Sequence, residues 1–146
     1  MISPCDATAG RTDASAAPPS GASRQLRVLV VDDHLLVRHG ICRQILELSN
    51  LRVVGEAADG FEAVALARTL SPDLVLMDIC MPGLDGIEAT RRIRAEVPRV
   101  RVIIVSSLEG EYHQKLALEA GAEACLVKGL TTEHLAATIQ QVFGSR

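Results

Sequence analysis

The sequence predicts an α/β fold in which a doubly wound parallel sheet of five strands carries helices on both faces. Short apolar runs typical of buried parallel strands lie at residues 28–31, 53–54, 74–77, 102–105 and 125–127. Stretches with apolar residues at helical spacing separate these runs. Regular alternation of the two patterns, with no long structureless loop to explain, indicates a single βα series.

Five helices are expected from the apolar spacing. Their marker residues, helix by helix, are Val37, Ile41, Ile45 and Leu48; Phe61, Val64 and Ala65; Ile87 and Ile93; Leu116 and Ala120; and Leu135, Ile139 and Val142. Asp85 is expected to cap the third helix, and Thr131 or Thr132 the fifth. Gly121 follows the fourth helix, where a C-terminal glycine is typical.

Composition limits the function classes. The chain has 146 residues, enough for one domain with a real core. Its net charge is -3, and it contains one Tyr, two Phe and no Trp. This acidic, aromatic-poor composition argues against a nucleic-acid surface. No apolar run is long enough for a membrane span, and no signal peptide precedes the domain. We therefore expect a cytoplasmic protein without direct membrane or nucleic-acid contact.

The four cysteines are Cys5, Cys42, Cys80 and Cys125. They lie far apart and form no Cys-x-x-Cys pair, so neither a zinc site nor a disulfide framework is indicated. We interpret them as free thiols of the cytosol.

Residues 1–24 differ from the rest of the chain. Seventeen of them are Ala, Ser, Thr, Pro or Gly, and no apolar periodicity is present. Such a segment buries too little apolar surface to offset the entropy of ordering it. The sequence predicts a disordered Ala/Ser/Pro-rich tail followed by one domain over residues 25–146. A transit peptide is the alternative, and Asp6 and Asp13 disfavour it.

Polar residues follow four of the five strands directly. Asp32 and Asp33 come after the first strand, Asp78 after the third, Ser106 after the fourth and Lys128 after the fifth. In open α/β sheets ligands bind at the carboxyl edge of the strands, where the strand order reverses. In the flavodoxin-like (βα)5 order 2-1-3-4-5, the first and third strands are neighbours. The three carboxylates are then expected to converge.

Converging carboxylates need a compensating charge. Two like charges about 4 Å apart repel by roughly 4 kcal/mol at an effective dielectric near 20. Protonation of one carboxylate is one solution, and a divalent cation supported by the ammonium of Lys128 is the other. Oxygen ligands with room for phosphate suit Mg²⁺ better than zinc or iron. This set fits phosphoryl transfer to a carboxylate, with Asp78 as nucleophile and Ser106 as hydrogen-bond donor.

Four stretches carry a resemblance to a known family. They are Val-Asp-Asp-His-Leu-Leu-Val-Arg (31–38), Val-Gly-Glu-Ala-Ala-Asp-Gly (54–60), Met-Asp-Ile-Cys-Met-Pro-Gly-Leu-Asp-Gly (77–86) and Ala-Gly-Ala-Glu-Ala-Cys-Leu-Val-Lys (120–128). Over residues 26–143 the chain resembles the receiver domains of two-component response regulators, and more narrowly those of the NarL/FixJ type.

The resemblance implies a role for each site residue. Asp78 would accept a phosphoryl group from a histidine kinase or phosphotransfer protein. Asp32, Asp33 and Asp78 would bind Mg²⁺ together with the backbone carbonyl of Cys80. Ser106 and Lys128 would bind the phosphoryl group and report it to the rest of the domain. The domain would not be an enzyme, because it assists only its own phosphorylation and dephosphorylation.

Three features depart from the family pattern. Cys125 occupies the position on the last strand where the family usually has an aromatic switch residue. Gly129 follows Lys128 where many receivers have proline, and glycine can make a tight turn there. The chain ends at Arg146, whereas NarL/FixJ-type regulators normally continue into a helix-turn-helix domain. No DNA-reading element is therefore expected in this chain.

Two kinds of alternative remain open. One is a pseudo-receiver, a protein-interaction module independent of phosphate, which Cys125 favours and the intact set Asp33, Asp78, Ser106 and Lys128 disfavours. The other is the receiver fragment of a NarL/FixJ-type transcription factor. A flavin-binding flavodoxin, a haloacid-dehalogenase-type phosphatase and a P-loop NTPase lack their defining motifs here.

The family's usual output surface is the last strand with the last two helices. We expect a downstream protein partner or a homodimer to bind there. His34, at the start of the first helix, is interpreted as a solvated surface residue and not as a metal ligand.

Overall fold

The computed structural model describes residues 25–108 and 110–144. Residues 1–24, for which a disordered tail was predicted, lie outside the described residues. In chain order the elements are β1 (Leu26–Val31), α2 (Leu35–Leu46), β2 (Leu51–Ala57), α3 (Gly60–Leu70), β3 (Leu74–Met77), α4 (Gly86–Glu96), β4 (Arg101–Ser106), α5 (Glu111–Glu119), β5 (Ala124–Val127) and α6 (Thr132–Gly144).

The five strands form one parallel sheet in the order β2-β1-β3-β4-β5. This arrangement confirms the predicted flavodoxin-like order 2-1-3-4-5. It makes β1 and β3 neighbours in the middle of the sheet, with Val31 paired to Met77 at their carboxyl ends. Residues that follow these two strands therefore emerge side by side.

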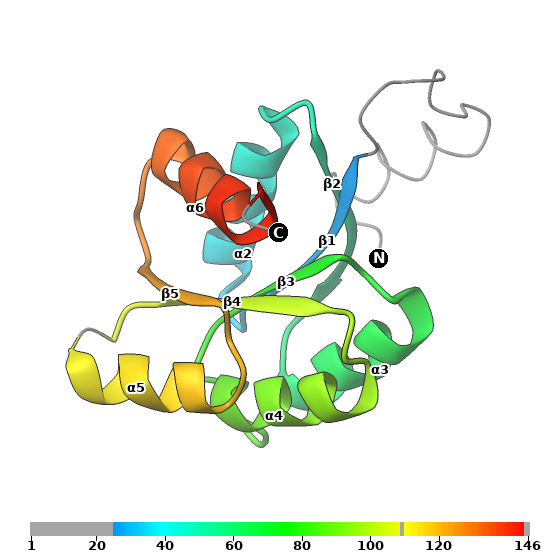
Figure 1. Cartoon of the computed structure of the whole chain (residues 1–146), viewed down its shortest axis with the longest axis vertical. Coiled ribbons are helices and arrows are strands. Elements are labelled where there is room, and N and C mark those ends of the chain that lie inside the picture. Colours follow the sequence, from blue (N-terminus) through cyan, green and yellow to red (C-terminus); the bar gives the residue numbers. More distant parts are fainter. Residues whose placement is uncertain (1–24, 109, 145–146) are drawn as a thin grey trace.

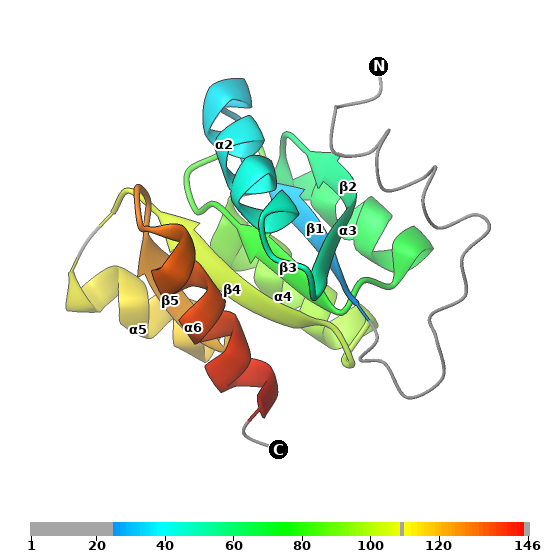
Figure 2. The same cartoon turned by 90° about the horizontal axis from the view of Figure 1, so that it is seen from above.

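Helices cover both faces of the sheet. Figure 1 shows α2 and α6 on one face and α3, α4 and α5 on the other. Figure 2, turned by 90°, looks onto the α2 and α6 side, with the strands running behind these helices. Successive strand residues point to opposite faces. Val28 and Val30 of β1 accordingly pack with α2 and α6, whereas Leu29 and Val31 pack in the core beneath α3 and α4.

Strand β2 is longer than its apolar pair at residues 53–54 suggested. It spans Leu51–Ala57, and buried residues alternate with partly exposed ones along it. β2 lies at the edge of the sheet, and Gly55 and Glu56 interrupt its apolar run. A prediction from continuous apolar residues therefore finds only the centre of this strand.

Two marker residues of the second helix were placed wrongly. The buried residues of α3 are Gly60, Ala63, Val64 and Ala67, whereas Phe61 is 58% exposed and Ala65 is also exposed. The Phe61 ring instead lies against Gly83 in the loop after β3. Small residues form the contact with the sheet, and the large ring covers a loop at the edge of the molecule.

The predicted helix boundaries are mostly correct. The Asp85 carboxylate accepts a hydrogen bond of 2.9 Å from the Glu88 amide at the start of α4. The Thr131 hydroxyl accepts one of 3.0 Å from the His134 amide at the start of α6. Leu48 was expected in the first helix, but α2 ends at Leu46, and Leu48 packs on the core from the following turn. Among the described residues, no helix is long and apolar enough to cross a bilayer.

Candidate functional site

The turn after β1 delivers two carboxylates to the carboxyl edge of the sheet. Asp32 is fully buried, and the Asp33 side chain is 27% exposed. The Asp32 amide donates a 3.1 Å hydrogen bond to the Ala57 carbonyl, which continues the sheet by one residue. Asp32 Oδ1 accepts a 2.8 Å bond from the His34 amide, so the turn closes on its own carboxylate.

Asp78 follows β3 and lies beside this turn. Its amide donates a 3.0 Å hydrogen bond to the Val31 carbonyl, and the side chain is only 2% exposed. Gly86 permits the close return of the loop, because a Cβ there would lie 1.8 Å from the Asp78 carbonyl oxygen. The Gly86 amide in turn donates a 2.8 Å bond to the Ile79 carbonyl. The start of α4 therefore fixes the backbone next to Asp78.

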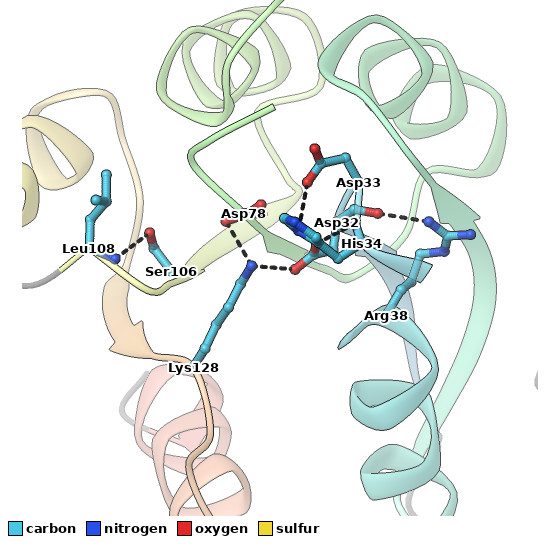
Figure 3. A network of polar contacts seen from close by, with 8 residues as sticks. All are labelled: Asp32, Asp33, His34, Arg38, Asp78, Ser106, Leu108 and Lys128. Carbon is cyan, nitrogen blue, oxygen red and sulfur yellow. Dashed lines mark hydrogen bonds and ion pairs between the residues drawn. The ribbon is translucent and has the colours of Figure 1, made fainter. Parts of the chain in front are cut away.

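Lys128 reaches the carboxylates from the end of β5. Its Nζ lies 2.8 Å from Asp32 Oδ2 and 3.3 Å from Asp78 Oδ1 (Figure 3). The Lys128 amide donates a 2.9 Å bond to the Ser106 carbonyl, which joins the ends of β4 and β5. Gly129 then makes the turn with a φ of 87°, a conformation that glycine adopts without strain.

Ser106 lies at the same edge but is not in contact with the carboxylates. It ends β4, is 1% exposed, and its hydroxyl accepts a 3.1 Å hydrogen bond from the Leu108 amide (Figure 3). Asp32, Asp33, Asp78 and Lys128 thus form one cluster. Ser106 stands next to it with its hydroxyl turned to its own loop.

His34 belongs to the cluster more closely than the sequence indicated. Its side chain is 67% exposed, in agreement with the predicted solvated position. Its Nδ1 nevertheless lies 3.1 Å from Asp33 Oδ1 and 3.4 Å from Asp32 Oδ1. Ligand atoms of Asp32, Asp33, His34 and Asp78 all lie within 4.8 Å of one another.

The electrostatics of the cluster show an excess of negative charge. Burial and the neighbouring charge of Asp32 raise the pKa of Asp78, and Lys128 offsets only part of this rise. Burial alone would lower the pKa of Lys128. The hydrogen bond with Asp32 and the charge of Asp78 outweigh that effect, so the pKa of Lys128 is raised. One ammonium therefore does not balance the three carboxylates.

The donor set fits a hard divalent cation. Asp78 Oδ2 is buried and has neither a hydrogen-bond partner nor an ion-pair partner among the described residues. Asp33 Oδ1 is also buried without a hydrogen bond, with only the imidazole of His34 beside it. A buried carboxylate oxygen without a partner is costly, and coordination of a cation would satisfy it. Oxygen ligands of this kind suit Mg²⁺ or Mn²⁺.

Arg38 is a contact of the site that the sequence analysis did not identify. From α2 its Nη1 donates a 2.7 Å hydrogen bond to the Asp32 carbonyl, and its Nε a 2.9 Å bond to Glu56 of β2. The motif 31–38 contains Arg38, but no spacing rule predicts a contact between the first turns of a helix and a neighbouring strand.

Cys80 and Cys125 lie close in sequence to Asp78 and Lys128, respectively. Cys80 is exposed in the loop two residues after Asp78. Cys125 lies in β5, where it pairs with Ile104 and packs on the core beneath α4 and α5. Burial raises the pKa of the Cys125 thiol. In the described part of the chain, Cys80 and Cys125 are free thiols, as predicted.

The fold and this acidic edge define a class of protein. Residues 28–140 match the response regulator receiver domain, and the chain belongs to that family. Over 121 residues it is 42% identical to the response regulator GacA of Pseudomonas aeruginosa, which covers 83% of this chain and 56% of that protein. The chain thus spans about half the length of the curated relatives it matches.

Solved structures give the same assignment. The signal receiver domain of NarL from Mycobacterium tuberculosis superposes with a TM-score of 0.80 at 32% identity, covering 84% of this chain and 99% of that one. A chain of the CheX-CheY-BeF3-Mg complex of Borrelia burgdorferi gives a TM-score of 0.77 at 32% identity, covering 82% of this chain and 90% of that one. The chain is therefore a signalling domain of two-component systems.

Proposed function

We propose that Asp78 accepts a phosphoryl group from the phosphohistidine of a sensor histidine kinase or phosphotransfer protein, in a reaction that requires Mg²⁺. The observation that carries this proposal is the buried, unpartnered Oδ2 of Asp78 beside two further carboxylates and one ammonium. A carboxylate oxygen without a partner inside the protein is available to a ligand from outside, and Asp78 Oδ2 is such an oxygen.

The transfer forms one bond and breaks one. A carboxylate oxygen of Asp78 attacks the phosphorus atom, and the phosphorus–nitrogen bond of the donor phosphohistidine breaks. The donor imidazole keeps the bonding electrons and takes up a proton, and Asp78 becomes an acyl phosphate. Asp78 must be ionised to attack, so the ammonium of Lys128 at 3.3 Å supports the reactive state despite the raised pKa of Asp78.

Asp32, Asp33 and Asp78, with the backbone carbonyl of Cys80, would hold the cation. When bound, Mg²⁺ neutralises charge on phosphoryl oxygens. A CheY relative was solved with BeF3 and Mg, which supports the choice of metal. Lys128 would pair with a phosphoryl oxygen. Ser106 would turn its hydroxyl from Leu108 to donate a hydrogen bond to another.

The output would be a changed protein–protein surface on α5, β5 and α6. Tyr112, Leu118 and Val127 are exposed apolar side chains on two of these elements, which supports a site for a downstream partner or a second copy. We also propose a cytoplasmic location, because a receiver must meet its kinase there. The domain is not an enzyme in this proposal.

The length of the relatives favours a second candidate function, in which the same phosphorylation controls a longer regulator. Because the chain spans 56% of GacA, it can correspond to the receiver part of a longer NarL/FixJ-type regulator. The site and its phosphorylation would be unchanged in that setting, and only the output would differ.

The experiment is incubation of the purified chain with acetyl phosphate, followed by intact mass. We expect the mass of one phosphoryl group to appear with Mg²⁺ and not with EDTA. A chain that never gains this mass with Mg²⁺ is a pseudo-receiver, the alternative that Cys125 favours. Labelling in EDTA at an equal rate would contradict the proposed metal requirement.

A further inference from the structure

We infer that Arg38 and Glu56 form an outer support that holds the Asp32–Asp33 turn in the geometry needed by a divalent cation. This inference rests on the proposed function, because it concerns the same metal site. Neither residue belongs to the ligand cluster of Asp32, Asp33, His34 and Asp78. The two act as positioning residues through the backbone of Asp32.

The geometry of Arg38 links three elements. From α2, its Nη1 donates to the Asp32 carbonyl at 2.7 Å, and its Nε donates to Glu56 Oε1 at 2.9 Å (Figure 3 shows the first contact). Both side chains are largely buried, at 15% exposed for Arg38 and 8% for Glu56. Glu56 Oε2 is buried without a hydrogen bond among the described residues. The guanidinium of Arg38 therefore compensates the negative charge of the Glu56 carboxylate.

The accepted carbonyl belongs to the peptide that joins Asp32 to Asp33. Its orientation decides where the Asp33 side chain points. On the other side of the same residue, the Asp32 amide is held by the Ala57 carbonyl of β2, next to Glu56. Asp32 is therefore held at its amide by β2 and at its carbonyl by Arg38 of α2, which is itself paired with Glu56 of β2.

This support opposes a real force. Carboxylates a few ångströms apart in a buried site repel one another, and the cluster contains three of them, with ligand atoms within 4.8 Å of one another. The turn carrying Asp32 and Asp33 would relax away from Asp78 if its peptide were free. Part of the binding free energy of a cation would then be used to bring the carboxylates back together. Groups behind metal ligands typically change affinity about 10- to 100-fold when removed.

Glu56 has a second role in this arrangement. Its Oε1 pairs with Arg38 Nε at 2.9 Å, so the Glu56 charge offsets that of the guanidinium beside the site. Without the Glu56 charge, Arg38 carries an uncompensated positive charge next to the site and competes with a cation for it. Loss of either residue should weaken metal binding, although the two act by different routes.

The test measures Mn²⁺ binding to the full chain by electron paramagnetic resonance, with thermal unfolding of each variant alongside. We expect Arg38→Met to weaken Mn²⁺ binding by about 10- to 100-fold. Arg38→Lys should weaken it similarly, because an ammonium cannot bridge both partners in fork geometry. Glu56→Gln keeps the side-chain volume and should weaken binding by a smaller factor.

Arg68→Met is the matched control. Arg68 pairs with Glu96 on the surface, where the side chains are 58% and 38% exposed, at the far end of α3 from the site. It should bind Mn²⁺ like the wild type. A purely structural Arg38–Glu56 pair would lower the melting temperature and leave Mn²⁺ affinity unchanged, and that result would overturn the inference.

The outcomes separate the two levels of the proposal. If the wild type binds no Mn²⁺, the proposed metal site fails, and the support falls with it. If the wild type binds Mn²⁺ and Arg38→Met binds it equally well, only the inference fails. Should Arg38→Met not fold, Glu56→Gln decides: wild-type Mn²⁺ affinity in that variant contradicts the support.

Discussion

Lys128 Nζ lies 3.3 Å from Asp78 Oδ1, which places the ammonium of β5 against the carboxylate of β3 across the intervening strand β4. A second contact of 2.8 Å to Asp32 makes Lys128 the cation shared by two buried acids. In the proposed reaction the same ammonium supports the ionised nucleophile and later pairs with the phosphoryl group.

Replacement of Lys128 should therefore slow phosphorylation severely. We expect Lys128→Met to be labelled by acetyl phosphate about 100-fold more slowly, since it removes a charge aimed at the reacting oxygens. Intact mass over time measures the rate. Lys115→Met, on the exposed surface of α5, is the matched control and should react like the wild type. Equal rates for both variants would exclude the assigned role of Lys128.

Removal of the Asp78 charge should stabilise the metal-free protein at neutral pH. The folded pKa of Asp78 lies above its ordinary value of 3.8, so the ionised form is less favourable in the fold than in the unfolded chain. Asp78→Asn removes this cost and should raise the melting temperature in EDTA at pH 7.5. About 1 kcal/mol corresponds to roughly 4 °C for a domain of this size, so a small gain is measurable.

The pH dependence of that gain has a definite sign. As pH falls through the raised pKa of Asp78, the wild type takes up the proton and regains the stability. The difference between the two melting curves should shrink from pH 7.5 towards pH 4.5. Mg²⁺ should also reduce it, because the ion stabilises only the protein that binds it well. A variant that is less stable than the wild type in EDTA at pH 7.5 would refute this account.

The close return of the loop to Asp78 should make Gly86 intolerant of a side chain. A Cβ there would lie 1.8 Å from the Asp78 carbonyl oxygen, so Gly86→Ala must displace the backbone of one or the other. We expect a loss of at least about 2 kcal/mol in the free energy of unfolding, measured by urea denaturation. Gly40→Ala in α2 has no atom within 4 Å of the new Cβ and should instead stabilise by about 0.5–1 kcal/mol.

The phosphorylated state should be long-lived. Two residues after Asp78 stands Cys80, and two residues after Ser106 stands Leu108, which packs partly buried on the core. Neither side chain orients a hydrolytic water well. We expect phospho-Asp78 to persist well beyond seconds once acetyl phosphate is removed, as followed by intact mass. Cys80→Asn places an amide at position 80 that can orient the water, so it should shorten the lifetime of phospho-Asp78. A wild-type half-life of seconds would rule out slow hydrolysis caused by Cys80 and Leu108.

Much of the fold followed from simple patterns. Each buried parallel strand gives a continuous apolar run, as at 28–31 and 74–77, and the strand order fits the polar residues at one edge. Phe61 was misplaced because helical spacing alone does not say whether a ring faces the sheet or an adjacent loop. β2 was shortened because an edge strand alternates in burial and its polar residues hide the run.

The charged residues of the site could be predicted from the sequence, but the contacts of His34 and Arg38 could not. Asp32, Asp33, Asp78 and Lys128 follow strand ends, and strand order alone brings them together. His34 and Arg38 could not be assigned, because their contacts depend on side-chain direction in the first turns of α2. The contact of Arg38 with Glu56 joins residues of different elements, and no periodicity in the sequence encodes it.

The central claim is that Asp78 is the phosphoryl acceptor, and a labelling comparison tests it most directly. Wild type, Asp78→Asn and Asp85→Asn are incubated with acetyl phosphate and Mg²⁺, and each intact mass is measured. Asp85 caps α4 through the Glu88 amide, and asparagine can keep that bond, so it controls for loss of a nearby carboxylate. We predict one added phosphoryl group on the wild type and on Asp85→Asn, and none on Asp78→Asn. Equal labelling of Asp78→Asn would contradict the assignment.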